Sequence, residues 1–332
     1  MLDKQRFDDA VGLINGAKNV LVTTHTRPDG DACGSVAAIL GALAGQGKNV
    51  KALMLSDVPE WYEFLFEERP AVLGRDVSVE RLCGGEFMNA DLIVLVDVNS
   101  KGQLPGFAEY LEKNQKKVLV FDHHVTNDGL GDVELIDVSA SAAGVIVFEF
   151  LEYGGFEISE KIAEALFLAI ATDTGWFRFS NTDSRSHRIC AELLESGVDS
   201  AKLYHGLYQN FSIERFRLMN LMLSRLELSF DGRYASQYVL QEDFVATGAK
   251  AGDTENLIDE CQRIGSVEVA ALFTEQADGR IKCSLRSRGA VDVRKIAQAF
   301  GGGGHTMASG TYLPGPLEEA KKLIYEKVNA QL

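Results

Sequence analysis

The sequence predicts an α/β protein whose first part is a mostly parallel open sheet flanked by helices. Continuous apolar runs at 20–22, 92–96 and 118–121 have the character of strands buried on both faces. A stretch rich in small apolar residues, 32–45, follows the first run and has the pattern of a packed helix. Strands that alternate with helices are typical of a parallel sheet.

The other elements of this part follow in order. A short amphipathic helix is expected over 1–18, a second strand over 49–55, and a helix or lid-like connection over 59–68. Helices are then predicted over 141–153, 158–171 and 184–196. A long, polar and mostly helical stretch from 199 to about 228 is expected to bridge two domains.

The second part predicts a smaller α/β domain with a mixed sheet. Asp231-Gly232 is a hairpin turn signal between strands at 226–230 and 234–240, and 267–274 is expected to pair with 280–286. Helices are expected over 256–264, 293–300 and 316–330. We therefore predict a catalytic domain over 1–190, a helical linker over 191–225 and a substrate-binding domain over 226–332.

Composition narrows the class of protein. The chain has 332 residues, which is long enough for two domains with their own cores. It has no apolar run of bilayer-spanning length, its start lacks the apolar core of a signal peptide, and its five cysteines are scattered without a C-x-x-C pair. We expect a cytoplasmic protein with no membrane partner, no disulfide framework and no zinc ribbon.

The net charge of −15 bears on the substrate. A protein that tracks long nucleic acid carries a broad basic surface. This composition excludes such a track, so phosphates would be bound in a local pocket by metal ions and a few arginines. Short RNA oligonucleotides or small nucleotides are the partners that fit.

The loop after the first strand carries His25, Asp29 and Asp31 in the pattern H-x-x-x-D-x-D. Open α/β sheets bind their ligands at the carboxyl ends of the strands. Imidazole and carboxylate groups at this spacing suit a hard or borderline divalent metal. Turn formation and helix capping explain the two aspartates about as well, so the loop alone leaves both interpretations open.

Later segments bring groups of the same kind. Asp97 ends the third buried strand and would face the same crevice, although a helix cap explains it when it is taken alone. Asp122, His123 and His124 follow the next strand, where packing does not account for three ionisable residues in a row. One histidine can bind a metal while its neighbour faces a different part of the cleft. Asp173 lies where a helix gives way to a turn, and turn chemistry is its alternative role.

Together these groups need cations. So many carboxylates and imidazoles in one crevice would repel one another unless positive charge lies between them. A pair of divalent metals about 3.5–4 Å apart, bridged by a shared carboxylate, removes this repulsion and suits phosphoester hydrolysis.

These motifs, taken together, resemble those of a known family. The D-x-D loop, the lone aspartate of the third strand, D-H-H and T-D-T-G are similar, in order and separation, to the motifs of the DHH phosphoesterase superfamily. R-S-R at 286–288 and G-G-G-G-H at 301–305 resemble its DHH-associated substrate-binding domain. The resemblance covers nearly the whole chain. Within the superfamily it is to the nano-RNase / 3′-phosphoadenosine 5′-phosphate phosphatase type of bacterial oligoribonuclease.

The resemblance implies roles for the residues of the first part. The implied metal ligands are His25 and Asp29 for a first ion, Asp31, His123 and Asp173 for a second, and Asp97 as the bridge. His124 would contact the scissile phosphate, and Asp122 would orient the histidines. Manganese is the usual metal of the family. The residue types indicate only that the ligand atoms are oxygen and nitrogen, so Mg²⁺ and Co²⁺ are alternatives to manganese.

Residues of the second part suit phosphate binding. Glycine lets backbone amides approach an anion, and His305 can add a donor next to the run. The glycines expected to contact substrate are Gly302, Gly303 and Gly304. Arg286 and Arg288 lie two apart near a strand end, so their guanidinium groups can face one side, where they suit phosphates and bases. Arg178, beside the Asp173 turn, is a further candidate. A flexible glycine linker and solvated arginines are the alternative.

We therefore expect a metal-dependent phosphodiesterase that degrades short oligoribonucleotides to 5′-mononucleotides, with 3′-phosphatase activity on 3′-phosphoadenosine 5′-phosphate. Cleavage of linear or cyclic dinucleotides, or of polyphosphate, keeps the same chemistry with another substrate. A non-catalytic nucleotide sensor is disfavoured, because no carboxylate of the ligand set is missing. The sequence leaves open whether the chain forms a homodimer.

Overall fold

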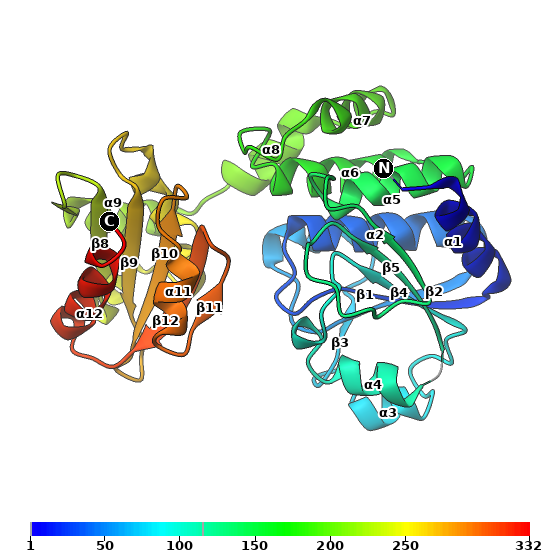
Figure 1. The fold of residues 1–332 in the computed structure, drawn as a ribbon, viewed down its shortest axis with the longest axis horizontal. Coiled ribbons are helices and arrows are strands. Elements are labelled where there is room, and N and C mark those ends of the chain that lie inside the picture. Colours follow the sequence, from blue (N-terminus) through cyan, green and yellow to red (C-terminus); the bar gives the residue numbers. More distant parts are fainter. Residues whose placement is uncertain (1, 115) are drawn as a thin grey trace. The chain divides into compact units, whose positions relative to one another are not determined.

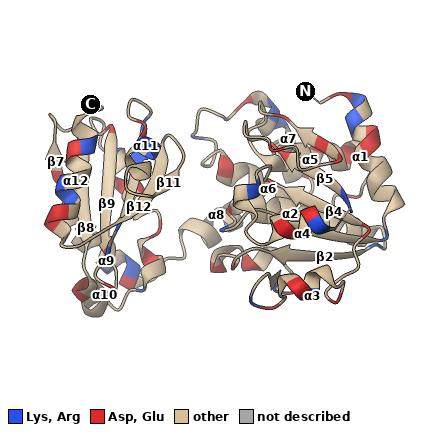
Figure 2. Ribbon diagram, turned by 60° about the horizontal axis from the view of Figure 1, so that its bottom comes forward, with Lys and Arg blue, Asp and Glu red and all other residues tan. Residues whose placement is uncertain are grey.

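The structure is a computed structural model that describes residues 2–114 and 116–332. The chain divides into two compact units, one ending at Gln209 and the other beginning at Asn210 (Figure 1). Figure 2 shows acidic and basic residues interspersed over the helices, strands and loops of both units. Among the described residues, no helix is both long and apolar enough to cross a bilayer.

The first unit is built on a parallel sheet with the strand order β3-β2-β1-β4-β5-β6 among its described residues. The strands are β1 (Asn19–Thr23), β2 (Asn49–Met54), β3 (Ala71–Val72), β4 (Leu92–Val96), β5 (Lys117–Asp122) and β6 (Val133–Ile136). The order reverses between β1 and β4, which pair with Thr23 opposite Leu95. In open α/β sheets such a reversal opens a ligand-binding crevice at the carboxyl ends of the strands. The predicted fold class is confirmed.

Helices cover both faces of this sheet (Figure 1). One face carries α1 (Lys4–Gly16), α2 (Gly30–Gly45), α5 (Ala143–Tyr153) and α6 (Glu160–Asp173), and the other carries α3 (Val79–Cys83) and α4 (Phe107–Lys113). Alternate residues of β4 enter the two cores, Val94 with α2 and Ile93 with α4. This burial on both faces explains the continuous apolar run. The helices α7 (Ser184–Glu195) and α8 (Ser200–Tyr208) complete the unit.

Several elements differ from the sequence-based expectation. The first helix begins at Lys4, and the predicted start at residue 1 lies outside the described residues. The segment 59–68 forms a short 3-10 helix, η1 (Glu60–Leu65). The helical stretch predicted from 199 is interrupted at 209–212, so that α8 and α9 (Ile213–Ser224) fall in different units. The elements β3, β6, α3 and α4 and the 3-10 helix η2 (Lys101–Gln103) were not predicted.

The second unit contains a mixed sheet with the order β11-β12-β10-β9-β8-β7 among its described residues. The strands are β7 (Glu227–Ser229), β8 (Tyr234–Val239), β9 (Val269–Glu275), β10 (Ile281–Ser287), β11 (Gly303–Gly304) and β12 (Ala308–Leu313). β8 and β9 are parallel, and the other pairs are antiparallel. The predicted hairpin of β7 with β8 and the pairing of β9 with β10 are confirmed.

Short helices pack on both faces of the mixed sheet. The helices α11 (Val293–Gln298) and α12 (Leu317–Asn329) cover one face, and α9 and the 3-10 helix η4 (Leu257–Arg263) cover the other. The remaining elements are α10 (Gln241–Thr247) and the 3-10 helix η3 (Ala251–Thr254). Because Leu218 and Met222 of α9 are fully buried in this core, α9 is an integral part of the second unit.

Candidate metal centre

The loop between β1 and α2 presents His25 and Asp29 at the point where the strand order reverses. The Nδ1 of His25 lies 2.9 Å from the carbonyl oxygen of Thr26, which leaves Nε2 facing the crevice, 3.4 Å from Oδ2 of Asp97. Asp29 caps α2, because its Oδ1 accepts a hydrogen bond from the amide of Ala32. Asp29 can therefore cap the helix with one carboxylate oxygen and bind a metal with the other.

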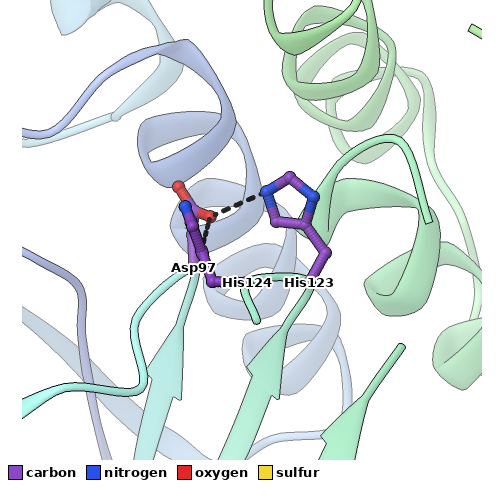
Figure 3. A group of neighbouring side chains, drawn as sticks. All are labelled: Asp97, His123 and His124. Carbon is purple, nitrogen blue, oxygen red and sulfur yellow. Dashed lines mark ion pairs between the residues drawn. The ribbon is translucent and has the colours of Figure 1, made fainter. Parts of the chain in front are cut away.

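Asp97 lies at the centre of the group (Figure 3). β4 stops at Val96 because Asp97 adopts a left-handed backbone conformation with φ of 55°. A residue other than glycine rarely adopts this conformation, and such strain is concentrated at functional sites. The Asp97 side chain is buried, and its Oδ1 has no hydrogen-bond partner among the described residues. That oxygen lies 3.5 Å from Nε2 of His123 and 3.6 Å from Nδ1 of His124.

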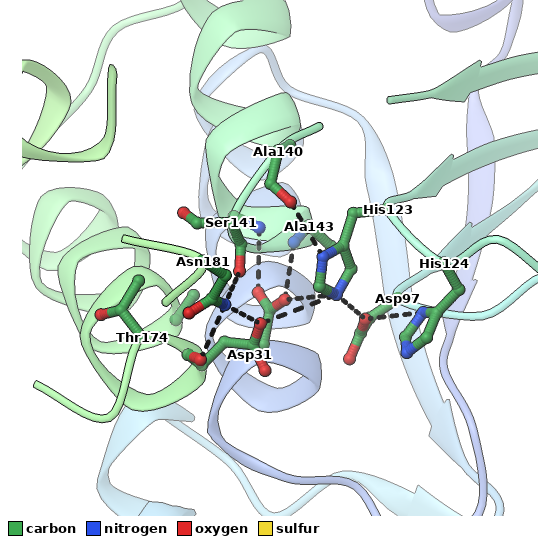
Figure 4. Close-up of polar contacts among 12 residues, drawn as sticks. Asp31, Asp97, His123, His124, Ala140, Ser141, Ala143, Thr174 and Asn181 are labelled. Atoms are coloured by element: carbon green, nitrogen blue, oxygen red, sulfur yellow. Dashed lines mark hydrogen bonds and ion pairs between the residues drawn. The ribbon is translucent and has the colours of Figure 1, made fainter. Parts of the chain in front are cut away.

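Asp31, His123 and Asp173 form a second group beside Asp97 (Figure 4). Asp31 lies in the first turn of α2, and its carboxylate accepts hydrogen bonds from the amides of Ala143 and Gly144 at the start of α5. Asp173 is the last residue of α6. Nε2 of His123 lies 3.8 Å from Oδ2 of Asp31 and 3.8 Å from Oδ2 of Asp173.

Three sets of donor atoms thus converge. In each set, one ligand atom of every residue lies within 4.8 Å of the others. Two of them match the predicted ligand groups, His25 with Asp29 and Asp97, and Asp31 with His123 and Asp173. The third set, Asp97, His123 and His124, shares residues with both. The structure therefore brings together all the residues that the sequence suggested as metal ligands. That these residues bind a metal is a prediction.

The carboxylates of the two groups are close enough to raise one another's pKa values. Burial, followed by repulsion from Asp97, raises the pKa of Asp31 well above its usual range. Asp29 is exposed at its surface, but desolvation by the surrounding crevice and repulsion from Asp97 raise its pKa as well. Burial raises the pKa of Asp173 to about 6. Without cations, some of these carboxyl groups retain protons near neutral pH. Divalent cations would replace those protons, which fits a donor set of carboxylates with an unpartnered oxygen.

The imidazoles show the complementary effect. Burial alone would lower the pKa of His25 and His123, but contact with the Asp97 carboxylate raises them to about 9 and about 10. Burial alone would raise the pKa of Asp97, and contact with the imidazoles lowers it. The protonated imidazoles of His25 and His123 thus offset part of the negative charge of the carboxylates. A metal ion would take the place of their Nε2 protons, as ligation by histidine requires the neutral ring.

Asp122 and His124 form a separate pair at the end of β5. Oδ1 of Asp122 lies 2.8 Å from Nδ1 of His124, and the Asp122 side chain is fully buried. The expectation that Asp122 orients both histidines is only half met by this geometry. The Nδ1 of His123 faces the carbonyl oxygen of Ala140 instead, at 3.2 Å. Both imidazoles also contact the same Asp97 carboxylate rather than different parts of the crevice, because they lie beyond the end of β5 and do not alternate as strand residues do.

The predicted arginines are engaged in local contacts. Arg178 is exposed, and its Nε donates to the carbonyl oxygen of Gly175 at 2.6 Å. In the second unit, Arg286 donates to Oδ1 of Asp259 at 3.1 Å. The guanidinium of Arg288 binds carbonyl oxygens at and beyond the end of η4, those of Gln262, Ile264 and Gly265. Arg286 and Arg288 do point to the same side, towards the η4 segment, but Arg288 has a structural role there.

The glycine run forms part of the mixed sheet. Gly303 and Gly304 are the edge strand β11, which pairs with β12. A Cβ atom on Gly302 would lie 2.2 Å from the carbonyl oxygen of Gly310, and Gly304 has φ of 135°. Close backbone approach and backbone conformation therefore account for these two glycines. His305 is exposed in the following turn, where its amide donates to the carbonyl oxygen of Ala308.

Sequence reasoning missed the segment that supports the second group of donors. The 140–144 segment, which leads into α5, contacts His123 through Ala140 and Asp31 through two amides. Asn181 was missed as well, although its side-chain amide contacts Asp173. A small-residue run ending in glycine before a helix is the only local signal for the segment, and Asn181 has none beyond its closeness to the T-D-T-G turn.

Comparison with known proteins identifies the family. Residues 19–170 match the N-terminal domain of the DHH family, and residues 231–332 match the DHHA1 domain. The chain is 33% identical to the bifunctional oligoribonuclease and PAP phosphatase NrnA of Thermus thermophilus, over 94% of this chain and 90% of that protein. It is 24% identical to the protein of the same name from Bacillus subtilis, over 88% of each.

Solved structures show the same fold. An exopolyphosphatase-related protein from Bacteroides fragilis superposes with a TM-score of 0.93 at 25% identity, covering 99% of this chain and 96% of that one. Exonuclease RecJ bound to manganese superposes with a TM-score of 0.57 at 15% identity, covering 100% of this chain and 96% of that one. The chain therefore belongs to the DHH family, with a DHH N-terminal domain followed by a DHHA1 domain.

Proposed function

We propose that this protein is a metal-dependent phosphodiesterase that degrades short oligoribonucleotides to 5′-mononucleotides and removes the 3′-phosphate of 3′-phosphoadenosine 5′-phosphate. The observation that carries the proposal is the position of Asp97. Its strained backbone places a buried carboxylate with an unpartnered oxygen between imidazoles from the loop after β1 and the end of β5. In this position the Asp97 carboxylate can bind two cations at the same time.

The proposed ligands follow the two groups of donors. His25 and Asp29 would hold one divalent cation, and Asp31, His123 and Asp173 would hold the other, with Asp97 between them. When bound, such a pair of cations activates water and neutralises charge on the phosphoryl oxygens. Imidazole and carboxylate donors suit Mn²⁺, and they also accept Mg²⁺ or Co²⁺.

His124 is proposed to contact the scissile phosphate. Its Nδ1 is held by Asp122, and its side chain is 34% exposed, so Nε2 is available to a substrate. The hydrogen bond to Asp122 raises the pKa of His124, which favours a ring that carries protons on both nitrogens. Nε2 can then donate a hydrogen bond to a phosphoryl oxygen or a proton to the departing oxygen.

The second unit is proposed to hold the remainder of the substrate. Arg286 and His305 are the strongest candidates. Among the described residues, Arg286 contacts a partly exposed carboxylate side chain and a neighbouring carbonyl, and His305 is exposed. Arg178, Arg288 and Gly302–Gly304 remain candidates from the sequence. This division of labour assigns catalysis to the predicted domain 1–190 and substrate binding to the predicted domain 226–332. The predicted linker 191–225 is divided between the two compact units, whose boundary lies between Gln209 and Asn210.

The choice of substrate rests on relatives and charge. The relatives named oligoribonuclease and PAP phosphatase cover most of this chain at 24–33% identity. The net charge of −15 disfavours a long nucleic-acid track, so binding energy would come from a few pocket contacts. A short RNA or a small nucleotide meets both conditions.

A substrate panel tests the proposal. Purified protein with Mn²⁺ is incubated with RNA oligomers of two to five residues, 3′-phosphoadenosine 5′-phosphate, linear and cyclic dinucleotides, and polyphosphate. We expect 5′-mononucleotides from the RNAs and release of phosphate from 3′-phosphoadenosine 5′-phosphate. Cleavage of polyphosphate or of cyclic dinucleotides alone would replace the proposed substrate. Nucleotide binding without turnover under any divalent metal would point to a sensor.

A further inference from the structure

Two members of the second group of donors, His123 and Asp31, are bound directly by the 140–144 segment at the start of α5 (Figure 4). The Ala140 carbonyl oxygen lies 3.2 Å from Nδ1 of His123, and the amides of Ala143 and Gly144 bind Asp31 at 2.6 and 2.9 Å. Asp173 has no direct hydrogen bond to this segment among the described contacts. It is connected to the segment through Asn181.

Asn181 bridges the end of α6 and the start of α5. Its Nδ2 lies 3.0 Å from the carbonyl oxygen of Ser141, 3.1 Å from the carbonyl oxygen of Asp173 and 3.4 Å from Oδ2 of Asp173. The main-chain contacts fix the spacing of the two helix ends, and the third contact orients the carboxylate. The same Ser141 is also tied to α7, because its hydroxyl lies 2.7 Å from that of Ser186.

The chain between Asp173 and Asn181 is folded back by an unusual turn. Gly175, Trp176 and Phe177 are consecutive residues with φ of 56°, 55° and 64°. Left-handed conformations cost free energy in residues that have a side chain, and they persist only where the surroundings enforce them. Here the Trp176 ring packs edge-on against Tyr204, with ring centroids 4.9 Å apart, and the Phe177 ring stacks on His187 at 5.0 Å. The strain is held in place by packing, and its result is the return of Asn181 to Asp173.

We propose that Asn181 is a positioning residue that fixes the Asp173 carboxylate relative to Asp31 and His123 and thereby sets the affinity of that group for a divalent cation. The proposal rests on the proposed metal-dependent function. Groups that orient metal ligands through hydrogen bonds typically change metal affinity by about 10- to 100-fold when they are removed. Because Asn181 is exposed to solvent, we expect the lower end of that range.

The test measures Mn²⁺ binding directly. Full-length wild-type protein, Asn181→Ala and Asn181→Ser are titrated with Mn²⁺ by calorimetry and electron paramagnetic resonance. Asn49→Ala is the matched control, because the side-chain amide of Asn49 donates to the side chain of Asn19 at the opposite, amino-terminal edge of the sheet. We expect about 10-fold weaker binding at one of two sites in Asn181→Ala, a smaller loss in Asn181→Ser, and wild-type binding in Asn49→Ala.

Kinetics separate positioning from substrate contact. At limiting Mn²⁺, Asn181→Ala should hydrolyse a short RNA slowly, and excess Mn²⁺ should restore kcat with an unchanged KM. Wild-type Mn²⁺ affinity in either folded Asn181 variant, or a raised KM at saturating Mn²⁺, would overturn the proposal while the proposed function stands. Loss of both sites with a lower Tm of the metal-free variant would also overturn it, in favour of a general structural role. Absence of Mn²⁺ binding in the wild type would instead overturn the proposed function.

Discussion

His124 Nδ1 lies 2.8 Å from Oδ1 of Asp122, a carboxylate that is fully buried under the crevice. The hydrogen bond engages Nδ1, so Nε2 is the ring nitrogen left for a substrate. Nδ1 of His124 also lies 3.6 Å from Oδ1 of Asp97, and the proposed function assigns His124 to protons at the phosphate rather than to metal binding.

Asp122→Asn should therefore damage turnover more than substrate binding. An asparagine amide can present a donor to Nδ1 and so favour the wrong tautomer of His124. We expect kcat on a short RNA to fall on the order of 100-fold or more, the scale of general acid–base catalysis, with KM changed by less than about threefold. Steady-state kinetics at saturating Mn²⁺ measure both values. An equal loss in kcat and gain in KM would show that His124 mainly binds substrate.

Arg286 and Arg288 should behave differently although they lie two residues apart. Arg288 binds carbonyl oxygens at and beyond the end of η4, so Arg288→Ala should lower the stability of the second unit by about 0.5–1.5 kcal/mol, the net contribution of a typical hydrogen bond. Arg286 can exchange Asp259 for a phosphate, so Arg286→Ala should raise KM with little effect on stability. Urea unfolding and kinetics of both variants check this division. The reverse pattern would assign substrate binding to Arg288.

The glycine run offers a matched pair of substitutions. A Cβ atom at Gly302 would collide with the Gly310 carbonyl oxygen, whereas nothing lies within 4 Å of a Cβ atom at Gly303. Gly302→Ala should cost about 1–3 kcal/mol through overpacking, and Gly303→Ala should stay within about 0.5 kcal/mol of the wild type. Thermal unfolding measures the difference. If Gly303→Ala keeps its stability but loses affinity for RNA, the edge strand contacts substrate.

A buried ion pair in the second unit gives a prediction on pH. Arg225 and a backbone amide bind Asp243 and, against the effect of burial, lower its pKa. The unfolded value is about 3.9. Because the folded pKa lies below it, the stabilisation is present above about pH 4 and is lost as the pH falls through the folded pKa.

Asp243→Asn should thus destabilise the protein at pH 7 by about 3 kcal/mol, since it leaves the Arg225 charge without its partner. The gap between variant and wild type should narrow at pH 3. Urea unfolding at the two pH values measures it. A gap that is as wide at pH 3 as at pH 7 would mean that the loss comes from packing rather than from the charge.

Much of the centre could be predicted from sequence because parallel strands bring their carboxyl ends together. The apolar runs of β4 and β5 are unambiguous, and the polar residues directly after them can only lie at one edge. This placed Asp97 and His123 correctly without any knowledge of contacts. The short edge strand β3 has two residues and no comparable pattern, which is why it was missed.

Contacts that depend on irregular backbone could not be predicted. The left-handed conformation of Asp97 has no signature in its own residue type, and neither does that of Trp176. The return of Asn181 to Asp173 depends on this turn and on the packing that holds it. The bonds of Arg288 likewise depend on where η4 ends, a boundary that propensity places only approximately.

The central claim is that Asp97 is shared by two divalent cations. Crystals grown with Mn²⁺ and measured at the manganese absorption edge test it most directly, because anomalous peaks locate the ions independently of activity. We expect two peaks about 3.5–4 Å apart, one beside His25 and Asp29, the other beside Asp31, His123 and Asp173, with an Asp97 oxygen on each. A single peak that does not contact Asp97, or no peak at these residues, would contradict it.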